Sequence, residues 1–117
     1  VLSGEDPLIV WGSGEQSRSF VYVEDVAEGM LLLTEKYPKA APVNLGSDEE
    51  IKIKDLARLI VDLCGRTCEI RFDKTKPDGH PRRNSDNTKA KEKIGFKSEI
   101  PLREGLQRTI DWYRREG

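Results

Sequence analysis

The chain has 117 residues, enough for one small domain with a modest hydrophobic core. Its 20 Lys and Arg nearly balance 21 Asp and Glu, giving a formal net charge of −1, so the overall charge does not favour binding to nucleic acid or to an anionic membrane. The sequence contains neither an apolar run of about 18 residues that could span a bilayer nor a recognisable secretion signal.

The two cysteines, Cys64 and Cys68, indicate a reducing compartment, because nothing else in the sequence suggests a disulfide framework. A single histidine, His80, accompanies them, which is too few ligands for a zinc site. Cys64 lies on the apolar face of a predicted helix, where a free cysteine acts as a small buried hydrophobe. We therefore expect a cytoplasmic protein without a metal.

Two short strands and a helix are predicted first. Residues 8–11 (Leu-Ile-Val-Trp) form an apolar run that ends at Gly12-Ser13-Gly14, which predicts a strand and a turn. Residues 19–23 (Ser-Phe-Val-Tyr-Val) are β-branched and aromatic and predict a second strand. Acidic residues then open a helix that ends before Pro38. Its apolar stripe consists of Val26, Ala27, Met30, Leu31 and Thr34, and Leu32 and Leu33 widen it, which predicts burial on more than one side.

The middle of the chain continues the alternation. Residues 43–46 (Val-Asn-Leu-Gly) predict a buried strand, and residues 53–64 predict a helix that Gly65 ends. The apolar face of that helix comprises Ile53, Leu56, Ala57, Ile60, Leu63 and Cys64. Residues 69–73 alternate in polarity and predict a further strand.

The last third is expected to hold a loop and two helices. Residues 74–86 contain two prolines and a glycine without periodicity, and loops of that length are often functional or disordered. A short helix over residues 88–94 ends at Gly95, and a terminal helix follows Pro101 with Leu102, Leu106, Ile110 and Tyr113 on one face. The predicted fold is mixed α/β, with short strands and about four helices.

Two segments carry chemistry that the fold does not require, residues 11–25 and 74–86. Five cationic residues lie in or beside the second segment: Arg71, Lys74, Lys76, Arg82 and Arg83. Arginines on a stiff loop suit bidentate recognition of phosphate oxygens, although a solvated basic loop has the same composition. Trp11, next to two glycines, is either core filling or a flat surface for a base or a sugar.

The order of the motifs resembles that of extended short-chain dehydrogenases/reductases that act on nucleotide sugars. These enzymes carry Trp-Gly-x-Gly-x-x-x-Arg-x-Phe-x-Tyr-Val-x-Asp-Val-Ala, then Val-Asn-x-Gly, then Ile-x-x-Leu-Ala-x-x-Ile. The matching residues are Trp11, Gly12, Gly14, Arg18, Phe20, Tyr22, Val23, Asp25, Val26, Ala27, Val43, Asn44, Gly46, Ile53, Leu56, Ala57 and Ile60. Residues 76–83 (Lys-Pro-Asp-Gly-His-Pro-Arg-Arg) resemble a motif of the GDP-L-fucose synthases, as does the ending around residues 95–113.

The resemblance implies that residues 1–117 form the C-terminal, substrate-binding domain of such an enzyme. By the same resemblance Trp11, Arg18 and Arg82 contact a nucleotide-diphosphate sugar, with Lys76 and Arg83 as further substrate-binding candidates. His80, Arg83 and Asn84-Ser85 stand where the fucose synthases carry Thr, Lys and Leu-Leu, so UDP-, CDP- and dTDP-sugars stay open alongside GDP-sugars.

Two motifs of the family are not found in these residues. No Gly-x-x-Gly-x-x-Gly follows a predicted strand, and no Tyr precedes a Lys by four positions. We therefore expect NAD or NADP to bind to a separate Rossmann domain of the intact enzyme and not to this chain. We also expect no catalysis by this chain alone, and self-association through the apolar surface that would face that domain. The alternative is a stand-alone nucleotide- or polyanion-binding module without catalysis.

Overall fold

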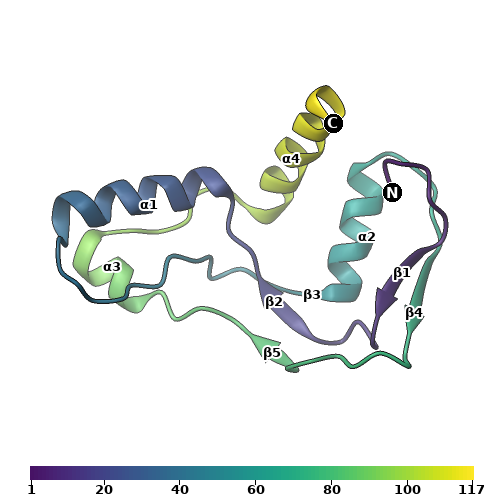
Figure 1. Ribbon diagram of the computed structural model, residues 1–117, viewed down its shortest axis with the longest axis horizontal. Coiled ribbons are helices and arrows are strands. Elements are labelled where there is room, and N and C mark those ends of the chain that lie inside the picture. The colour runs from purple at the N-terminus through teal and green to yellow at the C-terminus, as the bar shows by residue number, and fades with distance from the viewer. The chain divides into compact units, whose positions relative to one another are not determined.

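The computed structural model describes residues 1–117, and it divides into two compact units (Figure 1). Unit 1 consists of residues 1–18, 51–83 and 106–117, and unit 2 consists of residues 19–50 and 84–105. The chain passes from one unit to the other at four places. Three of them lie within β2 (Ser17–Ser19), β3 (Glu50–Lys52) and α4 (Leu102–Glu116), and the fourth lies between residues 83 and 84. The order of elements is β1-β2-α1-β3-α2-β4-β5-α3-α4, a mixed α/β fold as predicted.

Unit 1 is built on a parallel pair of strands and helix α2. Strand β1 (Leu8–Trp11) pairs with β4 (Ile70–Asp73), and the register runs from Leu8 opposite Ile70 to Trp11 opposite Asp73 (Figure 1). Helix α2 (Ile53–Leu63) has its apolar residues on one face, as its sequence period predicts. The buried hydrophobic residues of unit 1 are Val10, Ala57, Val61, Cys64 and Ile110.

Both ends of α2 agree with the sequence. The helix begins at the predicted residue, and Gly65 follows it with φ of +66°, the left-handed conformation in which glycine ends a helix. Cys64 is a free thiol with 3% of its surface exposed, which confirms the expected small buried residue. The carbonyl oxygen of Cys64 accepts a hydrogen bond from Nη2 of Arg114 at 2.6 Å, so α4 is tied to the end of α2.

Unit 2 is built on helices α1 (Val23–Lys36) and α3 (Thr88–Ile94). Its core contains Ala90, Ile94 and Phe96, against which pack Leu32, Leu33, Tyr37, Val43 and Leu45. The buried carboxylate of Asp25 accepts hydrogen bonds from the backbone N–H groups of Glu99 (3.2 Å) and Ile100 (3.1 Å). This buried acid therefore holds the segment after α3 against the first turn of α1.

Helix α1 carries a second apolar side that the core of unit 2 does not cover. Val23, Met30 and Leu31 are 69%, 59% and 67% exposed, and Ala27 between them is exposed as well. These four residues follow the i, i+4, i+7, i+8 spacing of a single helix face, which we call the α1 stripe. No helix in the structure is long and apolar enough to cross a membrane.

Three strand predictions need correction. The strand predicted over residues 19–23 shares only Ser19 with β2, which starts earlier, and Val23 instead opens α1. Residues 43–46 do not form a strand, since they pair with no other strand; Val43 and Leu45 instead pack on the core of unit 2. The predicted loop over residues 74–86 is interrupted by β5 (Arg82–Arg83), and the sheet order is β3-β2-β5. Such pairings depend on residues distant in sequence.

Candidate functional site

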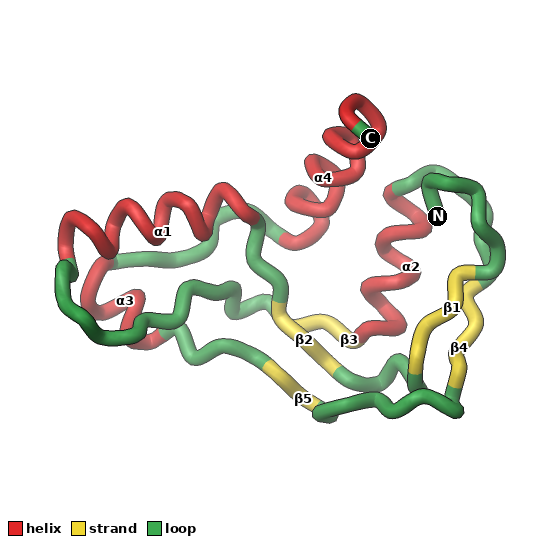
Figure 2. Tube along the Cα trace, viewed as in Figure 1, coloured by secondary structure: helices red, strands yellow, loops and turns green.

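Two facing loops in unit 1 and the strands that flank them carry the predicted site. At the end of the β1–β4 pair, the N–H of Gly12 donates to the carbonyl of Asp73 (2.9 Å), and the two segments then separate. The two segments come together again where the N–H of Ser17 donates to the carbonyl of Pro81 (2.9 Å), just before the parallel β2–β5 pair. We call residues 12–16 the short loop and residues 74–81 the basic loop; both are drawn as loops between strands in Figure 2.

A carboxylate joins the two loops. Asp78 of the basic loop accepts hydrogen bonds from the N–H of Ser13 (2.5 Å) and from its hydroxyl (2.7 Å). The hydroxyl and then the N–H of Ser13 lower the pKa of Asp78, because both favour the charged carboxylate. At Gly12, whose φ is +86°, a Cβ would lie 2.1 Å from Oδ1 of Asp78, so this approach requires glycine.

Arg18 forms a second connection between the segments. Its Nη1 donates to the carbonyl oxygen of His80 at 2.8 Å and to that of Ser17 at 2.7 Å. Arg18 is also the register partner of Arg83 in the β2–β5 pair. Two guanidinium groups are thus held on neighbouring strands, where like charges are unfavourable unless an anion lies nearby.

Trp11 and Lys76 form a third contact. Trp11 at the end of β1 is 65% exposed, so it does not fill the core, and that alternative is wrong. The ammonium of Lys76 lies 5.1 Å from the centroid of the ring, within the range of a cation–π interaction. An exposed aromatic face next to a cation suits a ligand that combines a planar ring with negative charge.

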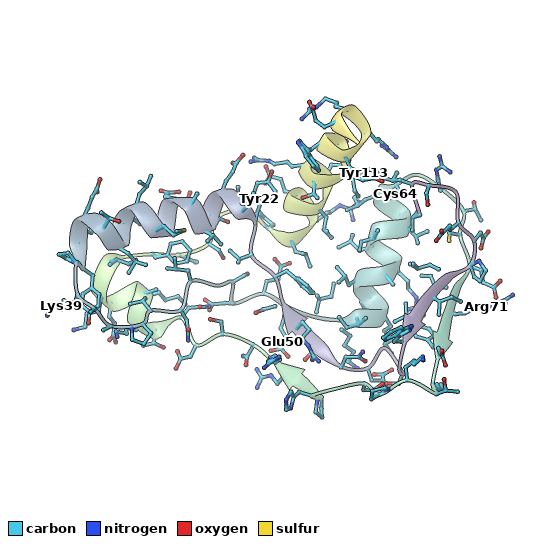
Figure 3. All side chains as sticks on the ribbon, viewed as in Figure 1. Tyr22, Lys39, Glu50, Cys64, Arg71 and Tyr113 are labelled. Carbon is cyan, nitrogen blue, oxygen red and sulfur yellow. The ribbon has the colours of Figure 1, made fainter.

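The cationic residues differ in their surroundings. Arg82 and Arg83 form β5 and are exposed. Arg71 on β4, labelled in Figure 3, donates to both carboxylate oxygens of Glu69 at 2.9 and 3.1 Å. Glu69 therefore occupies the guanidinium of Arg71, which the sequence does not imply as a substrate-binding residue.

Sequence reasoning missed a carboxylate that orders the short loop. Glu15 forms salt bridges with Lys54 (2.6 Å) and Lys52 (2.9 Å), and the hydrogen bonds from Lys54 and then Lys52 lower its pKa to about 2. The N–H of Lys54 also donates to the carbonyl of Gly14 (2.9 Å), so the short loop is attached to the start of α2. The alternating glycines pointed to a tight turn, but no local pattern identified the partners of Glu15.

No group of three or more His, Cys, Asp or Glu residues in the structure could hold a metal ion. The two loops hold the carboxylates of Glu15 and Asp78 and the imidazole of His80, whereas the residues implied in substrate binding supply cations and one exposed aromatic ring. Such a set of groups can bind an anionic ligand and orient its ring.

Comparison with known proteins shows which proteins this chain resembles in sequence and fold. Residues 1–46 match the model described as the NAD dependent epimerase/dehydratase family. Solved structures of extended short-chain epimerases and reductases superpose on nearly the whole chain. The chain is therefore similar in sequence and in fold to members of this family, as its motifs indicated.

Among curated relatives, GDP-L-fucose synthase 1 of Arabidopsis thaliana is 37% identical over 112 residues, which is 96% of this chain and 34% of the relative. UDP-glucose 4-epimerase of Thermotoga maritima, solved with UDP-glucose, is 34% identical with a TM-score of 0.84, covering 97% of this chain and 36% of that one. A GDP-L-fucose synthetase of Naegleria fowleri, solved with NADP, is 29% identical with a TM-score of 0.84, covering 92% of this chain and 34% of that one. The chain thus spans about a third of the length of these proteins.

Proposed function

We propose that this chain is the substrate-binding part of an NAD(P)-dependent nucleotide-sugar epimerase or reductase and that its two facing loops, together with the strands that flank them, bind the nucleotide-diphosphate sugar. The observation that carries the proposal is that the residues for which the sequence implied this role all lie in unit 1, where Lys76 contacts Trp11 and Arg18 lies opposite Arg83, next to Arg82. These residues come from segments distant in sequence, and the β1–β4 and β2–β5 pairs bring the segments together.

The chemistry of these residues matches the two ends of such a ligand. In our proposal the exposed face of Trp11 receives the base or the sugar, and Lys76 stays beside it. Arg18 and the arginines of β5 receive the diphosphate, whose charge offsets the repulsion between the register partners Arg18 and Arg83. The bonds from Nη1 of Arg18 to backbone carbonyls fix the plane of its guanidinium group, which reduces the entropy lost on binding.

We propose further that NAD or NADP and the catalytic groups belong to a separate Rossmann domain of the intact enzyme. The absence of Gly-x-x-Gly-x-x-Gly and of Tyr-x-x-x-Lys from residues 1–117 supports this division. In the same proposal the α1 stripe faces that domain, which accounts for an apolar surface that unit 2 itself leaves exposed.

Calorimetric titration with GDP, UDP and pyrophosphate tests the binding role. We expect saturable binding of a nucleoside diphosphate, with Arg82→Ala weakening it by roughly 10- to 150-fold, as for the loss of a charge-assisted hydrogen bond. Arg71→Ala is the matched control, since it removes the same charge from β4, outside the proposed diphosphate site.

The three ligands separate the alternatives. Preference for GDP supports the fucose-synthase branch, and preference for UDP assigns the chain to another branch of the family. Equal binding of pyrophosphate and both nucleotides favours a stand-alone polyanion-binding module. No binding of any ligand, or equal effects of Arg82→Ala and Arg71→Ala, contradicts the proposed site.

A further inference from the structure

Asp78 joins the basic loop to the short loop at a point between the two sides of the candidate site. We propose that Asp78 is a positioning residue, whose carboxylate latches the basic loop onto Ser13 and so fixes Lys76 and Trp11 relative to Arg18. The inference rests on the proposed nucleotide-binding function and deepens it, because a carboxylate would repel a diphosphate and cannot serve as its ligand.

The contacts of Asp78 have the form of a latch. Each carboxylate oxygen accepts one hydrogen bond from Ser13, one from the backbone at 2.5 Å and one from the hydroxyl at 2.7 Å. The hydroxyl oxygen of Ser13 also accepts a hydrogen bond from the N–H of Glu15 at 3.2 Å. Since Glu15 is held by Lys54 at 2.6 Å, the latch is connected to the first turn of α2.

The position of Asp78 in the basic loop explains what the latch would control. Backbone hydrogen bonds to the carbonyls of Asp73 and Pro81 attach the two ends of this loop to the neighbouring segment, and the N–H of Lys76 donates to the carbonyl of Asp73 at 3.2 Å. Asp78 lies between Lys76, whose ammonium is over the ring of Trp11, and His80, whose carbonyl accepts from Arg18. Releasing Asp78 therefore frees the centre of the loop and with it the spacing between the aromatic side and the arginine side of the site.

A simple charge effect predicts the opposite result to a latch. Replacing Asp78 with Asn removes a negative charge beside a cationic site, which by electrostatics alone strengthens the binding of any anion. A latch predicts weaker binding of a ligand that needs both the ring and the cations. It predicts no such loss for pyrophosphate, which has no ring to place on Trp11.

The test measures amide hydrogen exchange and calorimetric affinity on the 117-residue chain. We expect Asp78→Asn to speed exchange of the Ser13 amide about 10-fold and to weaken the preferred nucleotide, GDP or UDP, about 5-fold, while pyrophosphate binds as well as before or better. Ser13→Ala, which keeps the backbone bond, should have a smaller effect, and the double variant should be less than additive. Asp62→Asn removes the same charge from α2 and should change none of these values.

The possible results separate the latch from the proposed function. Faster Ser13 exchange with unchanged or tighter nucleotide binding overturns the positioning role, and unchanged exchange overturns the latch itself. If the unmodified chain binds neither nucleotide, the proposed function fails and the positioning role fails with it, whereas slow Ser13 exchange would still show that the loops are joined. Slow hydrogen exchange of the α2 amides verifies that each variant is folded. If Asp78→Asn does not fold, Ser13→Ala supplies the milder variant.

Discussion

At the scale of single residues, the two loops approach so closely that one position tolerates no side chain. Gly12 has φ of +86°, and a Cβ there would lie 2.1 Å from Oδ1 of Asp78 and 3.1 Å from its Cα. A Cβ would therefore displace the carboxylate of Asp78 from Ser13 and push against the Cα of Asp78. Glycine at this position therefore serves the contact between the loops in addition to the turn itself.

We predict that Gly12→Ala destabilises the chain by about 1–3 kcal/mol, through strain at positive φ and the collision with Asp78. Gly65→Ala is the matched control, because Gly65 has φ of +66° and nothing within 4 Å of its Cβ position. Urea unfolding measures the free energy of unfolding of both variants. The loss at Gly12 in excess of the loss at Gly65 is the cost of the collision with Asp78. Equal losses of free energy of unfolding in the two variants would show that the contact between the added Cβ and Asp78 does not destabilise the chain.

At the scale of elements, the sequence predicted those whose pattern is local. Helices α2, α3 and α4 and strands β1 and β4 agree with prediction within one residue at their starts, since periodicity, prolines and terminal glycines mark them. Strands β3 and β5 were missed, because a short polar segment becomes a strand only when a distant partner pairs with it. The boundary between β2 and α1 was misplaced because Val23 suits a strand by type yet opens the helix.

The α1 stripe makes a prediction about association. We expect the chain to self-associate as its concentration rises, because Val23, Met30 and Leu31 expose apolar surface along one face of α1. Leu31→Glu should shift light-scattering masses toward the monomer, since a charge in an apolar contact is unfavourable. Trp112→Gln on α4, where the indole is 54% exposed, serves as a control outside the stripe and should leave association unchanged. Monomeric behaviour of the unmodified chain at high concentration would refute the prediction.

At the scale of the whole molecule, the candidate site could be predicted in part. The residue types and the family motif indicated Trp11, Arg18, Lys76, Arg82 and Arg83, and the structure places all five in unit 1. The sequence could not indicate that Asp78 would bind Ser13 or that Glu15 would bind Lys54, because these contacts follow from the pairing of β1 with β4 and of β2 with β5. The ring and the cations were visible as chemistry, whereas the groups that hold them in place depend on the fold.

Our last prediction concerns catalysis. We expect the 117-residue chain to oxidise no NADPH with a nucleotide-linked keto sugar, because hydride transfer needs a cofactor held against the substrate and a positioned proton donor. Residues 1–117 carry neither the glycine-rich dinucleotide motif nor a Tyr-x-x-x-Lys pair. The absorbance of NADPH measures turnover, and nucleotide binding by the same sample verifies an intact site. Turnover that scales with protein concentration and falls in Arg82→Ala would contradict the prediction and place catalytic groups within these residues, whereas turnover unaffected by that substitution would indicate a contaminating enzyme.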